Sequence, residues 1–194
     1  MDSEVRRMTK ERLKFCLEMM RKYPEQTAYI HPSVVIPEWV SIGENVVVHE
    51  GVTLGSQGFG FERDSNGVWL HIPHIGRLVI EDNVEIFEGT NICRGTIEDT
   101  VIGKGTKIYA LCHIGHNAII GKNCLLTAHC IIGGSSVLGD NVYVGLNTTI
   151  KNKIKVVDGV FIGQSSNVVK DIIIENSVWA GNPAKFLRWR KETE

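Results

Sequence analysis

Large aliphatic residues recur at every sixth position along most of the chain. From Ile102 to Ile174 the phase is unbroken, and earlier blocks keep it from Ile30 to Leu54 and from Ile80 to Ile92. Neither an α-helix nor a long strand has a period of six, so the pattern predicts a structural repeat. Two insertions interrupt the repeat, a long one after Leu54 and one of four residues after Ile92.

Each repeat also carries a small or β-branched residue four positions after the aliphatic one. Positions two apart in a strand share a face, so this residue and the next aliphatic residue both point inward. Glycine often follows the aliphatic residue directly, and we expect these glycines to form corners with unusual dihedrals. Three repeats close one triangular coil of about 18 residues, and stacked coils pair their strands. The sequence predicts an all-β solenoid, a parallel β-helix of hexapeptide repeats.

The 194 residues suit one domain with three parts. Residues 1–24 have apolar side chains at helical spacing and predict an N-terminal amphipathic helix. Residues 25–180 are predicted to form the β-helix, with one long inserted loop at 55–77. Residues 181–194 are predicted to be a C-terminal cap that contains a short basic helix.

Charge and hydropathy exclude several partners. The 21 Lys and Arg nearly balance the 22 Asp and Glu, so nothing in the charge balance calls for nucleic acid as a partner. No apolar run approaches the length of a membrane span, and no signal peptide opens the chain. We therefore expect a cytoplasmic protein without membrane insertion.

Three of the five cysteines occupy the inward small position of the repeat. Cys112, Cys124 and Cys130 are therefore predicted to be core residues, because a free Cys packs as a small hydrophobe. Cys112 and Cys130 are separated by three repeats, which make one coil, and should stack on adjacent coils, near enough for a disulfide. In a cytosolic protein we expect thiols.

The histidines of the same stretch fall at outward positions. His113, His116 and His129 occupy different corners or faces of the triangle, whereas a metal site needs convergent ligands. We predict no metal at these residues.

His116 stands out because of its neighbours in the stacking register. Counting three repeats back from His116 leads to Glu98, and counting three repeats forward leads to Gly134. Adjacent coils are about 4.8 Å apart, so the Glu98 carboxylate is expected to orient the imidazole. The Gly134 N–H is expected to face a developing oxyanion, which together describes a site for acyl transfer. The alternative is a surface histidine with coincidental neighbours.

Several motifs in this region resemble one enzyme family. "GSQGFGF" (55–61), "GVWLHIPHIGRLVIEDNVEI" (67–86), "RGTIEDTVIGKGTKI" (94–108) and "IGHNAIIGKN" (114–123) are similar to the catalytic core of the UDP-3-O-acylglucosamine N-acyltransferase family of hexapeptide-repeat acyltransferases. The resemblance covers about residues 50–165 and implies a left-handed β-helix, a homotrimer with active sites between subunits, and His116 as the general base with Gly134 as oxyanion donor. It also implies contact of the inserted loop with the acceptor sugar, for which we single out Phe59, Phe61, His74 and Asn117 as substrate-binding residues. The alternative is that the loop packs on its own coil and hides its aromatic side chains.

Other positions depart from that family. A second family histidine is replaced by Lys153, an acidic residue by Tyr109, and the Asp of an Asp-Arg-Gly motif by Cys93. The family's N-terminal uridine-binding domain and its C-terminal extension associated with acyl carrier protein have no counterpart here. We therefore expect a relative of that enzyme rather than the enzyme itself.

The C-terminal segment indicates a different acyl donor. "VWAGNPAKFLRWR" (178–190) resembles the closing segment of acetyl-CoA-dependent hexapeptide acetyltransferases. The resemblance implies that Lys185, Arg188 and Arg190 lie near the phosphates of coenzyme A, where cations are favoured. Acyl-CoA is then a co-substrate, and no permanently bound cofactor is expected.

Together these observations predict an acyl-CoA-dependent N-acyltransferase. Its expected acceptor is the amine of a nucleotide-linked amino sugar in surface glycan biosynthesis, its acyl group is acetyl or another short chain, and His116 is its base. One alternative is an O-acetyltransferase that acts on a sugar or serine hydroxyl. A second is a non-catalytic or metal-binding β-helix protein.

Overall fold

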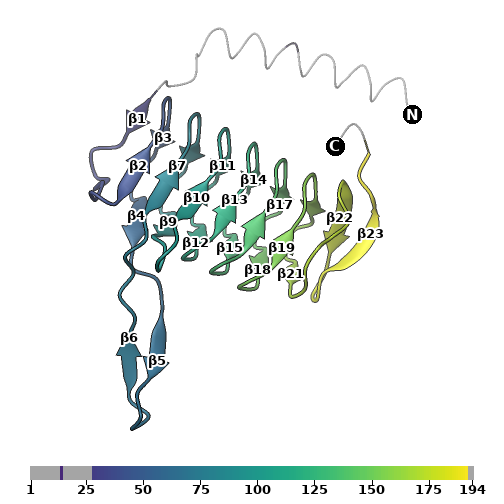
Figure 1. The fold of residues 1–194 in the computed structure, drawn as a ribbon. Helices are drawn as coiled ribbons and strands as arrows, with labels where there is room; N and C mark the ends of the chain where they lie inside the picture. Colours follow the sequence, from purple (N-terminus) through teal and green to yellow (C-terminus); the bar gives the residue numbers. More distant parts are fainter. Residues whose placement is uncertain (1–13, 15–27, 192–194) are drawn as a thin grey trace.

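The described part of the chain winds into a left-handed parallel β-helix (Figure 1); the six-residue period predicted the parallel solenoid, and the family resemblance implied its hand. The computed structural model describes residue 14 and residues 28–191. The predicted N-terminal helix therefore lies outside the described residues apart from Lys14. No helix in the described residues has the length and apolar character needed to cross a bilayer.

Three parallel sheets form the faces of the solenoid. The first runs through β1 (Tyr29–Ile30), β3 (Val47–Val48), β8 (Glu85–Ile86), β11 (Lys107–Ile108), β14 (Leu125–Leu126), β17 (Tyr143–Val144), β20 (Phe161–Ile162) and β22 (Ser177–Ala180), and ends with the antiparallel β23 (Lys185–Trp189). The second contains β2 (Val40–Ile42), β7 (Leu78–Ile80), β10 (Thr100–Ile102), β13 (Ile119–Ile120), β16 (Val137–Leu138) and β19 (Lys155–Val156). The third contains β4 (Thr53–Ser56), β9 (Asn91–Cys93), β12 (His113–Ile114), β15 (Ile131–Ile132), β18 (Thr149–Ile150) and β21 (Asn167–Val168).

The register places one aliphatic side chain of each strand on the axis of the solenoid. Ile114 pairs with Ile132, three repeats further along the chain, and both side chains are fully buried. Where the short insertion intervenes, the spacing widens by the length of that insertion, and Ile92 pairs with Ile114. Each such side chain contributes about 1.5–3 kcal/mol by leaving water. The regular spacing thus builds one continuous core.

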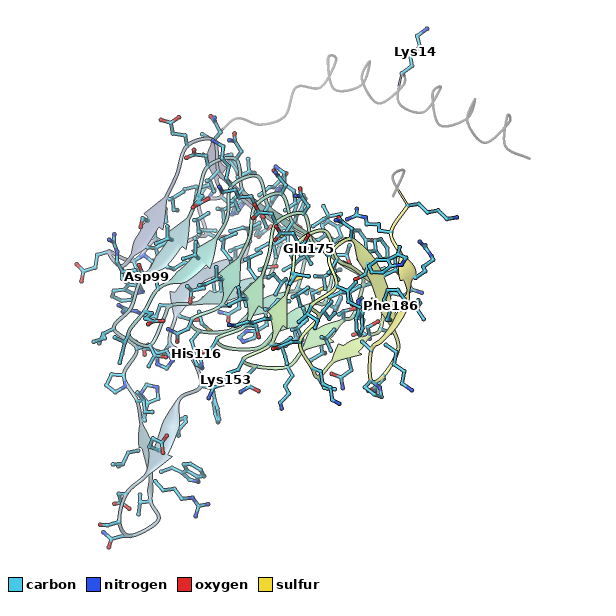
Figure 2. The ribbon with its side chains drawn as sticks, turned by 45° about the vertical axis from the view of Figure 1, so that its right-hand side comes forward. Lys14, Asp99, His116, Lys153, Glu175 and Phe186 are labelled. Carbon is cyan, nitrogen blue, oxygen red and sulfur yellow. The ribbon has the colours of Figure 1, made fainter. Side chains whose placement is uncertain are left out.

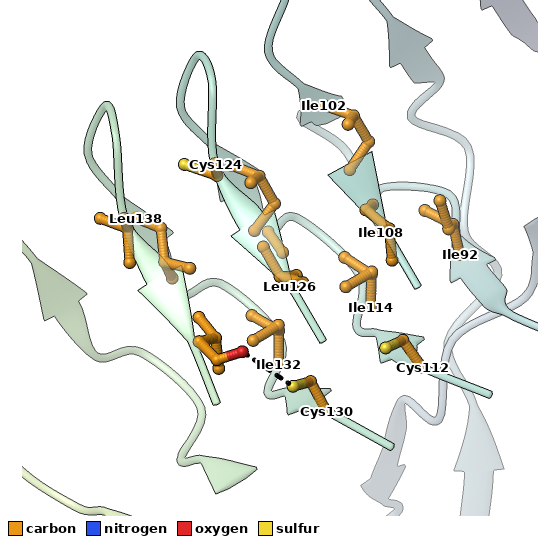
Figure 3. Close-up of a cluster of buried hydrophobic side chains, with 14 of the residues drawn as sticks. Ile92, Ile102, Ile108, Cys112, Ile114, Cys124, Leu126, Cys130, Ile132 and Leu138 are labelled. Carbon is orange, nitrogen blue, oxygen red and sulfur yellow. Dashed lines mark hydrogen bonds between the residues drawn. The ribbon is translucent and has the colours of Figure 1, made fainter. Parts of the chain in front are cut away.

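The thiols belong to that core. Cys112, Cys124 and Cys130 lie among the aliphatic side chains (Figure 3), and all three are buried and free, which confirms the prediction from their position in the repeat. Cys93 is also buried and free. Burial raises the pKa of the Cys124 thiol to about 11. That thiol is therefore protonated at neutral pH.

The corners correct one expectation about the glycines. The residue with positive φ is not the glycine that follows the aliphatic residue, but the residue two positions later, such as Asn117 at 58° or Asn141 at 59°. The glycine is required for space: a Cβ on Gly115 would lie 2.6 Å from the backbone nitrogen of Gly134 on the next coil, and one on Gly121 would collide with the carbonyl of Gly139. Close stacking of the coils, rather than a special dihedral, selects glycine there.

The long insertion contains a β-hairpin. Strands β5 (Phe61–Arg63) and β6 (Trp69–His71) pair in antiparallel fashion and project away from the solenoid (Figure 1). Of the two alternatives for its aromatic side chains, the structure shows exposure: Phe59 is 91% exposed and Trp69 is 58% exposed. The guanidinium of Arg63 lies over the Trp69 ring.

The C-terminal segment is a strand, so the prediction of a short helix there is wrong. After a turn at Gly181–Ala184 the chain reverses, and β23 pairs with β22. The edge of β22 would otherwise present unpaired backbone groups, which β23 satisfies. The hexapeptide phase also ends early, because Ile172 rather than Ile174 is the fully buried residue before β22 and forms a bridge to Val156.

Candidate active site

His116 lies at a corner of the solenoid, directly after β12. Its Nδ1 is 2.8 Å from Oδ1 of Asn117 and 3.2 Å from Oγ1 of Thr96. An amide oxygen accepts hydrogen bonds and cannot donate them, so Nδ1 must carry the proton. The other ring nitrogen, Nε2, therefore keeps its lone pair in the neutral ring, which is the form that a general base requires.

Asn117 holds the orientation of this imidazole. Its Oδ1 accepts hydrogen bonds from the backbone N–H and the hydroxyl of Thr96, at 3.1 and 2.8 Å. Its Nδ2 donates to the backbone carbonyl of Glu98 at 2.9 Å, which fixes the direction of the amide. The left-handed backbone of Asn117 turns the side chain onto the neighbouring ring. The sequence singled out Asn117 as a substrate-binding residue, whereas the structure places it as the ring's hydrogen-bond partner.

The Glu98 carboxylate does not take the position expected for it. Glu98 is exposed, and its contact near the site is made by its backbone carbonyl. The physical reason is the short insertion after Ile92, which widens the corner between β9 and β10 and takes Glu98 out of the simple stack. Thr96, which lies in the same widened corner, contacts the ring in its place. Thr96 carried no signal in the repeat, because the insertion breaks the phase there.

Gly134 does meet His116, as the stacking register predicts. A Cβ on Gly134 would lie 2.8 Å from Nε2 of His116, and its three nearest atoms would all belong to that ring. The carbonyl of Gly134 accepts a hydrogen bond from the N–H of Lys153 on the next coil. Among the described residues, the N–H of Gly134 donates to no acceptor. A free backbone donor therefore lies beside the free lone pair of the candidate base.

A second imidazole, that of His74, packs against His116. The ring centroids are 5.1 Å apart, and the ring planes are inclined by 79°. His74 is only 2% exposed, and its Nδ1 donates to the carbonyl of Ile72 at 2.9 Å. Its Nε2 is buried without a hydrogen-bond partner. Burial lowers the pKa of His74, and the neighbouring charges of His116, His71 and Arg94 lower it further, so the ring is neutral at neutral pH.

The inserted segment covers both rings. A Cβ on Gly58 would lie 2.5 Å from Nε2 of His74 and 2.9 Å from Cδ2 of His116, so only glycine fits there. From this point aromatic side chains continue outward, since the ring of His71 packs on Phe61 and that of Phe61 on Phe59. A cavity of about 400 Å³ on the hairpin is lined by Phe59, Phe61 and Trp69. Of the predicted acceptor residues, Phe59 and Phe61 therefore form an exposed surface on the hairpin, whereas His74 is buried between that hairpin and His116.

Arg94 fastens the base of the hairpin to the solenoid. It is buried, its guanidinium donates to the carbonyls of Gly76 and Ile75 at 2.7 and 3.0 Å, and it lies over the Trp39 ring at 4.3 Å. Cys93, beside it, is 3.6 Å from the hydroxyl of Ser56. The sequence did not single out Arg94, although its position in the family motif offered a signal.

The other histidines do not gather at one point with His116. His113 is hydrogen-bonded through Nδ1 to Asn91 at 3.0 Å, and burial lowers its pKa. His129 is an exposed corner residue with positive φ. In the part of the chain that the structure describes, no group of three His, Cys, Asp or Glu side chains is arranged to hold a metal ion.

Lys185 and Arg188 lie on the last strand, β23, and Arg190 follows it; Phe186 of that strand lies away from His116 (Figure 2). Lys185 borders a cavity of about 270 Å³, together with Lys170, Trp179 and residues 183–184. Arg190 donates to the carbonyls of Asn141 and Gly159 at 3.3 and 3.1 Å, and so ties the segment to earlier corners. Within one chain, the structure does not bring Lys185, Arg188 or Arg190 to the base.

Comparison with known proteins agrees with this fold. The family model described as bacterial transferase hexapeptide (six repeats) matches residues 25–56 and 99–134. UDP-3-O-acylglucosamine N-acyltransferase 2 of Rhodopseudomonas palustris is 55% identical over 76 residues, which cover 39% of this chain and 20% of that protein. UDP-3-O-acylglucosamine N-acyltransferase of Coxiella burnetii is 42% identical over 88 residues, or 45% and 26% of the two chains. The matches span about a quarter or less of these curated relatives.

Solved structures share the architecture over more of the chain. LpxA of Acinetobacter baumannii has a TM-score of 0.60 at 25% identity, with 84% of this chain and 72% of that one covered. AntD of Bacillus cereus, an N-acyltransferase solved as a mutant with dTDP and coenzyme A, has a TM-score of 0.58 at 18% identity, with 78% and 85% covered. The latter likeness shows the fold alone. The resemblance to left-handed β-helix acyltransferases that the sequence motifs predicted is confirmed.

Proposed function

We propose that this protein transfers an acyl group from coenzyme A to the amine of a nucleotide-linked amino sugar. Its repeat and its β-helix are those of the hexapeptide-repeat acyltransferases. The observation that carries this proposal is the pairing of His116 with Gly134. A lone pair held on Nε2 by the Nδ1–Asn117 hydrogen bond lies beside a backbone N–H without an acceptor among the described residues. These are the base and the oxyanion donor that acyl transfer needs.

The proposed chemistry uses these two groups in sequence. The acceptor amine attacks the carbonyl carbon of the thioester while a proton passes from its nitrogen to Nε2 of His116. The carbonyl oxygen becomes negatively charged and accepts a hydrogen bond from the N–H of Gly134. The C–S bond then breaks, the amide carbonyl reforms, and the imidazolium returns its proton to the departing thiolate. Asn117 keeps the ring in one tautomer throughout.

An amino-sugar nucleotide as acceptor is supported by the names of the relatives and by the hairpin. The similar proteins of Rhodopseudomonas palustris and Coxiella burnetii are both named UDP-3-O-acylglucosamine N-acyltransferases. The exposed rings of Phe59, Phe61 and Trp69 offer flat apolar faces on which a sugar or a base can stack. Production of surface glycans in the cytoplasm is the setting we propose, and buried free thiols suit a reducing compartment.

Coenzyme A as donor is supported by the C-terminal segment. Lys170 and Lys185 border the cavity beside β23, and Arg188 lies on the same strand. Clustered cations favour phosphate groups, and the apolar side chains of Ile172 and Trp179 in the same cavity suit the uncharged part of the cofactor. Acyl carrier protein is the alternative donor that a kinetic comparison has to exclude.

We propose that the working form is a homotrimer. Outward-facing Ile119, Leu125 and Ile131 are each more than 40% exposed in the single chain, and they lie on neighbouring strands of the three faces. Because each of them lies on a different face, they form no single patch, and the proposed trimer rests on the resemblance to the hexapeptide-repeat acyltransferases. The resemblance to that family also implies active sites between subunits, so we propose that a neighbouring copy borders the His116 corner.

The test is a thiol-release assay over a panel of nucleotide amino sugars and short acyl-CoAs. His116→Asn should lower turnover by roughly 10²–10⁴, because it removes the general base. His129→Asn is the matched control, since His129 is also an outward-facing corner histidine of the solenoid, and it should keep full activity. Transfer to hydroxyl acceptors alone would instead favour the O-acetyltransferase. No thiol release with any member of the panel would contradict the proposed function.

A further inference from the structure

His74 is a buried titratable group for which the proposed proton transfer has no direct use. Because its Nδ1–H is given to the Ile72 carbonyl, the lone pair lies on Nε2. That nitrogen is buried, and no donor contacts it. A buried acceptor without a partner costs free energy, so such a group calls for an explanation.

The surrounding contacts show that this position is built rather than accidental. Gln57 brackets the backbone of His74, with its Oε1 accepting from the His74 N–H at 2.8 Å and its Nε2 donating to the carbonyl at 3.4 Å. Arg94 holds the next two carbonyls, those of Ile75 and Gly76. Gly58 and Gly60 leave the space into which the ring fits. The imidazole is therefore fixed from both sides.

The free nitrogen of His74 lies next to His116. A Cβ built on Gly58 would lie 2.5 Å from Nε2 of His74 and 2.9 Å from Cδ2 of His116. Both rings therefore border the same small space at Gly58. The ring planes meet nearly at right angles, at 79°. Solvent does not reach Nε2 of His74, and the His116 ring, with its centroid 5.1 Å from that of His74, is the titratable group that packs directly against it.

We propose that His74 is a positioning residue whose unpartnered Nε2 lone pair stabilises the positive charge that His116 acquires when it takes the proton of the acceptor. The lone pair has no partner while His116 is neutral, and it gains a positive one when the imidazolium forms. An interaction made only in the charged state lowers the barrier without tightening substrate binding. This inference rests on the proposed function, because it assigns His74 a part in the same proton transfer.

The other charges around the pair keep His74 neutral in that state. His71 packs on it with ring centroids 6.1 Å apart, and Arg94 lies behind it. His113 faces His116 from β12, and Lys153 belongs to the corner beyond Gly134. All of these are cationic or become cationic on protonation, so His116 can be charged only while His74 is not. Of the two facing imidazoles, burial makes His74 the one that stays neutral.

Two substitutions separate the two nitrogens of His74. His74→Asn keeps a donor near the position of Nδ1 for the Ile72 carbonyl but removes Nε2. His74→Gln extends to the position of Nε2 and offers an oxygen acceptor there. We expect His74→Asn to move the NMR titration midpoint of the His116 ring to lower pH by about one unit, and to lower kcat about ten-fold with both KM values unchanged. His74→Gln should remain close to the unmodified protein in both measurements.

The NMR titration needs no substrate, so the two proposals can fail separately. If the titration of His116 moves as expected but no amino sugar is acylated, the proposed function is wrong while the contact between the rings stands. An unchanged titration in His74→Asn would overturn the inference even in an active enzyme. A raised acceptor KM at unchanged kcat would also overturn it, because His74 would then bind substrate. Should His74→Asn fail to fold, ¹⁵N shifts of the unmodified protein decide: His74 protonating before His116 contradicts the inference.

Discussion

At the scale of single residues, the site combines Asn117, which directly follows His116, with Thr96 and Gly134 from the two adjacent coils. Asn117 and Thr96 fix one side of the His116 ring, and Gly134 faces the other. Each contributes through a backbone position that the coil geometry sets. The ring therefore needs no carboxylate to hold its tautomer, because an amide oxygen with three donors around it performs that task.

Gly134→Ala should lower turnover about 100-fold and leave stability nearly unchanged. The new Cβ would meet only the His116 ring, which must tilt away from Asn117, and the φ of Gly134 is not in the left-handed region. Displacement of a catalytic group by about 1 Å can lower the rate about 100-fold. Steady-state kinetics and a thermal melt check this, with Gly163→Ala in the last coils as the control. A melting temperature that falls together with activity would instead indicate a structural role.

Counting repeats in the sequence correctly predicted contacts between site residues that follow the regular stacking of the coils, about 18 residues each. It gave wrong contacts for site residues beside an insertion. His116 and Gly134 are separated by one regular coil, so counting repeats brought them together. Glu98 and Thr96 lie in a corner widened by the short insertion, where counting places the wrong side chain against the ring. The contact of His74 with His116 depends on how the long insertion folds back, which no period in the sequence describes.

At the scale of elements, the corners do as much to specify the fold as the strands. Most strands of the solenoid contain two residues and would not form alone. Glycine beside the strand lets the coils approach, and asparagine two residues later accepts the left-handed backbone. The strands were predictable because their side chains alternate. The hairpin in the insertion and the strand β23 were not, because their pairing is antiparallel and lies outside the repeat.

Asn147 offers a test of the corner geometry. It is exposed, with a φ of 56°, so its side chain contributes little packing. Asn147→Val should destabilise the protein by about 1–2 kcal/mol, because a β-branched residue is strained in the left-handed region. Asn147→Gly should cost much less. Equilibrium denaturation in urea compares the two, and equal losses would show that this corner tolerates other dihedrals.

The inward cysteines test the register of the strands. Replacing Cys16 by Ser leaves only the four thiols that the structure buries. At pH 8 none of the four should react with a thiol reagent in the native protein. All four should react once denaturant unfolds the chain. Both burial and the raised pKa of Cys124, about 11, oppose thiolate formation. Cys130→Ala should cost on the order of 1 kcal/mol and leave activity intact. Rapid labelling of the native protein would contradict the register.

At the scale of the whole molecule, the groups proposed for catalysis and for donor binding lie at different points along the solenoid. β12, which precedes His116, is near the middle of the solenoid, the hairpin leaves the N-terminal coils after β4, and β23 is at the C-terminal end (Figure 1). A rigid β-helix cannot fold to join them. The phosphates and the thioester of acyl-CoA lie at opposite ends of an extended molecule, so cations on β23 and a base at His116 can serve one donor without contacting each other.

Neutralising the cations of β23 tests that link. Lys185→Gln combined with Arg188→Gln should raise the KM for acyl-CoA several-fold and make it less sensitive to salt, because exposed phosphate contacts are screened and act mainly in binding. The KM for the sugar should change little. Arg190 is left intact, since its hydrogen bonds to Asn141 and Gly159 hold the strand in place. The control is Lys122→Gln, which removes a cation from an earlier corner. An unchanged KM for acyl-CoA in the double variant, or activity with acyl carrier protein only, would show that β23 is a cap and that the donor binds elsewhere.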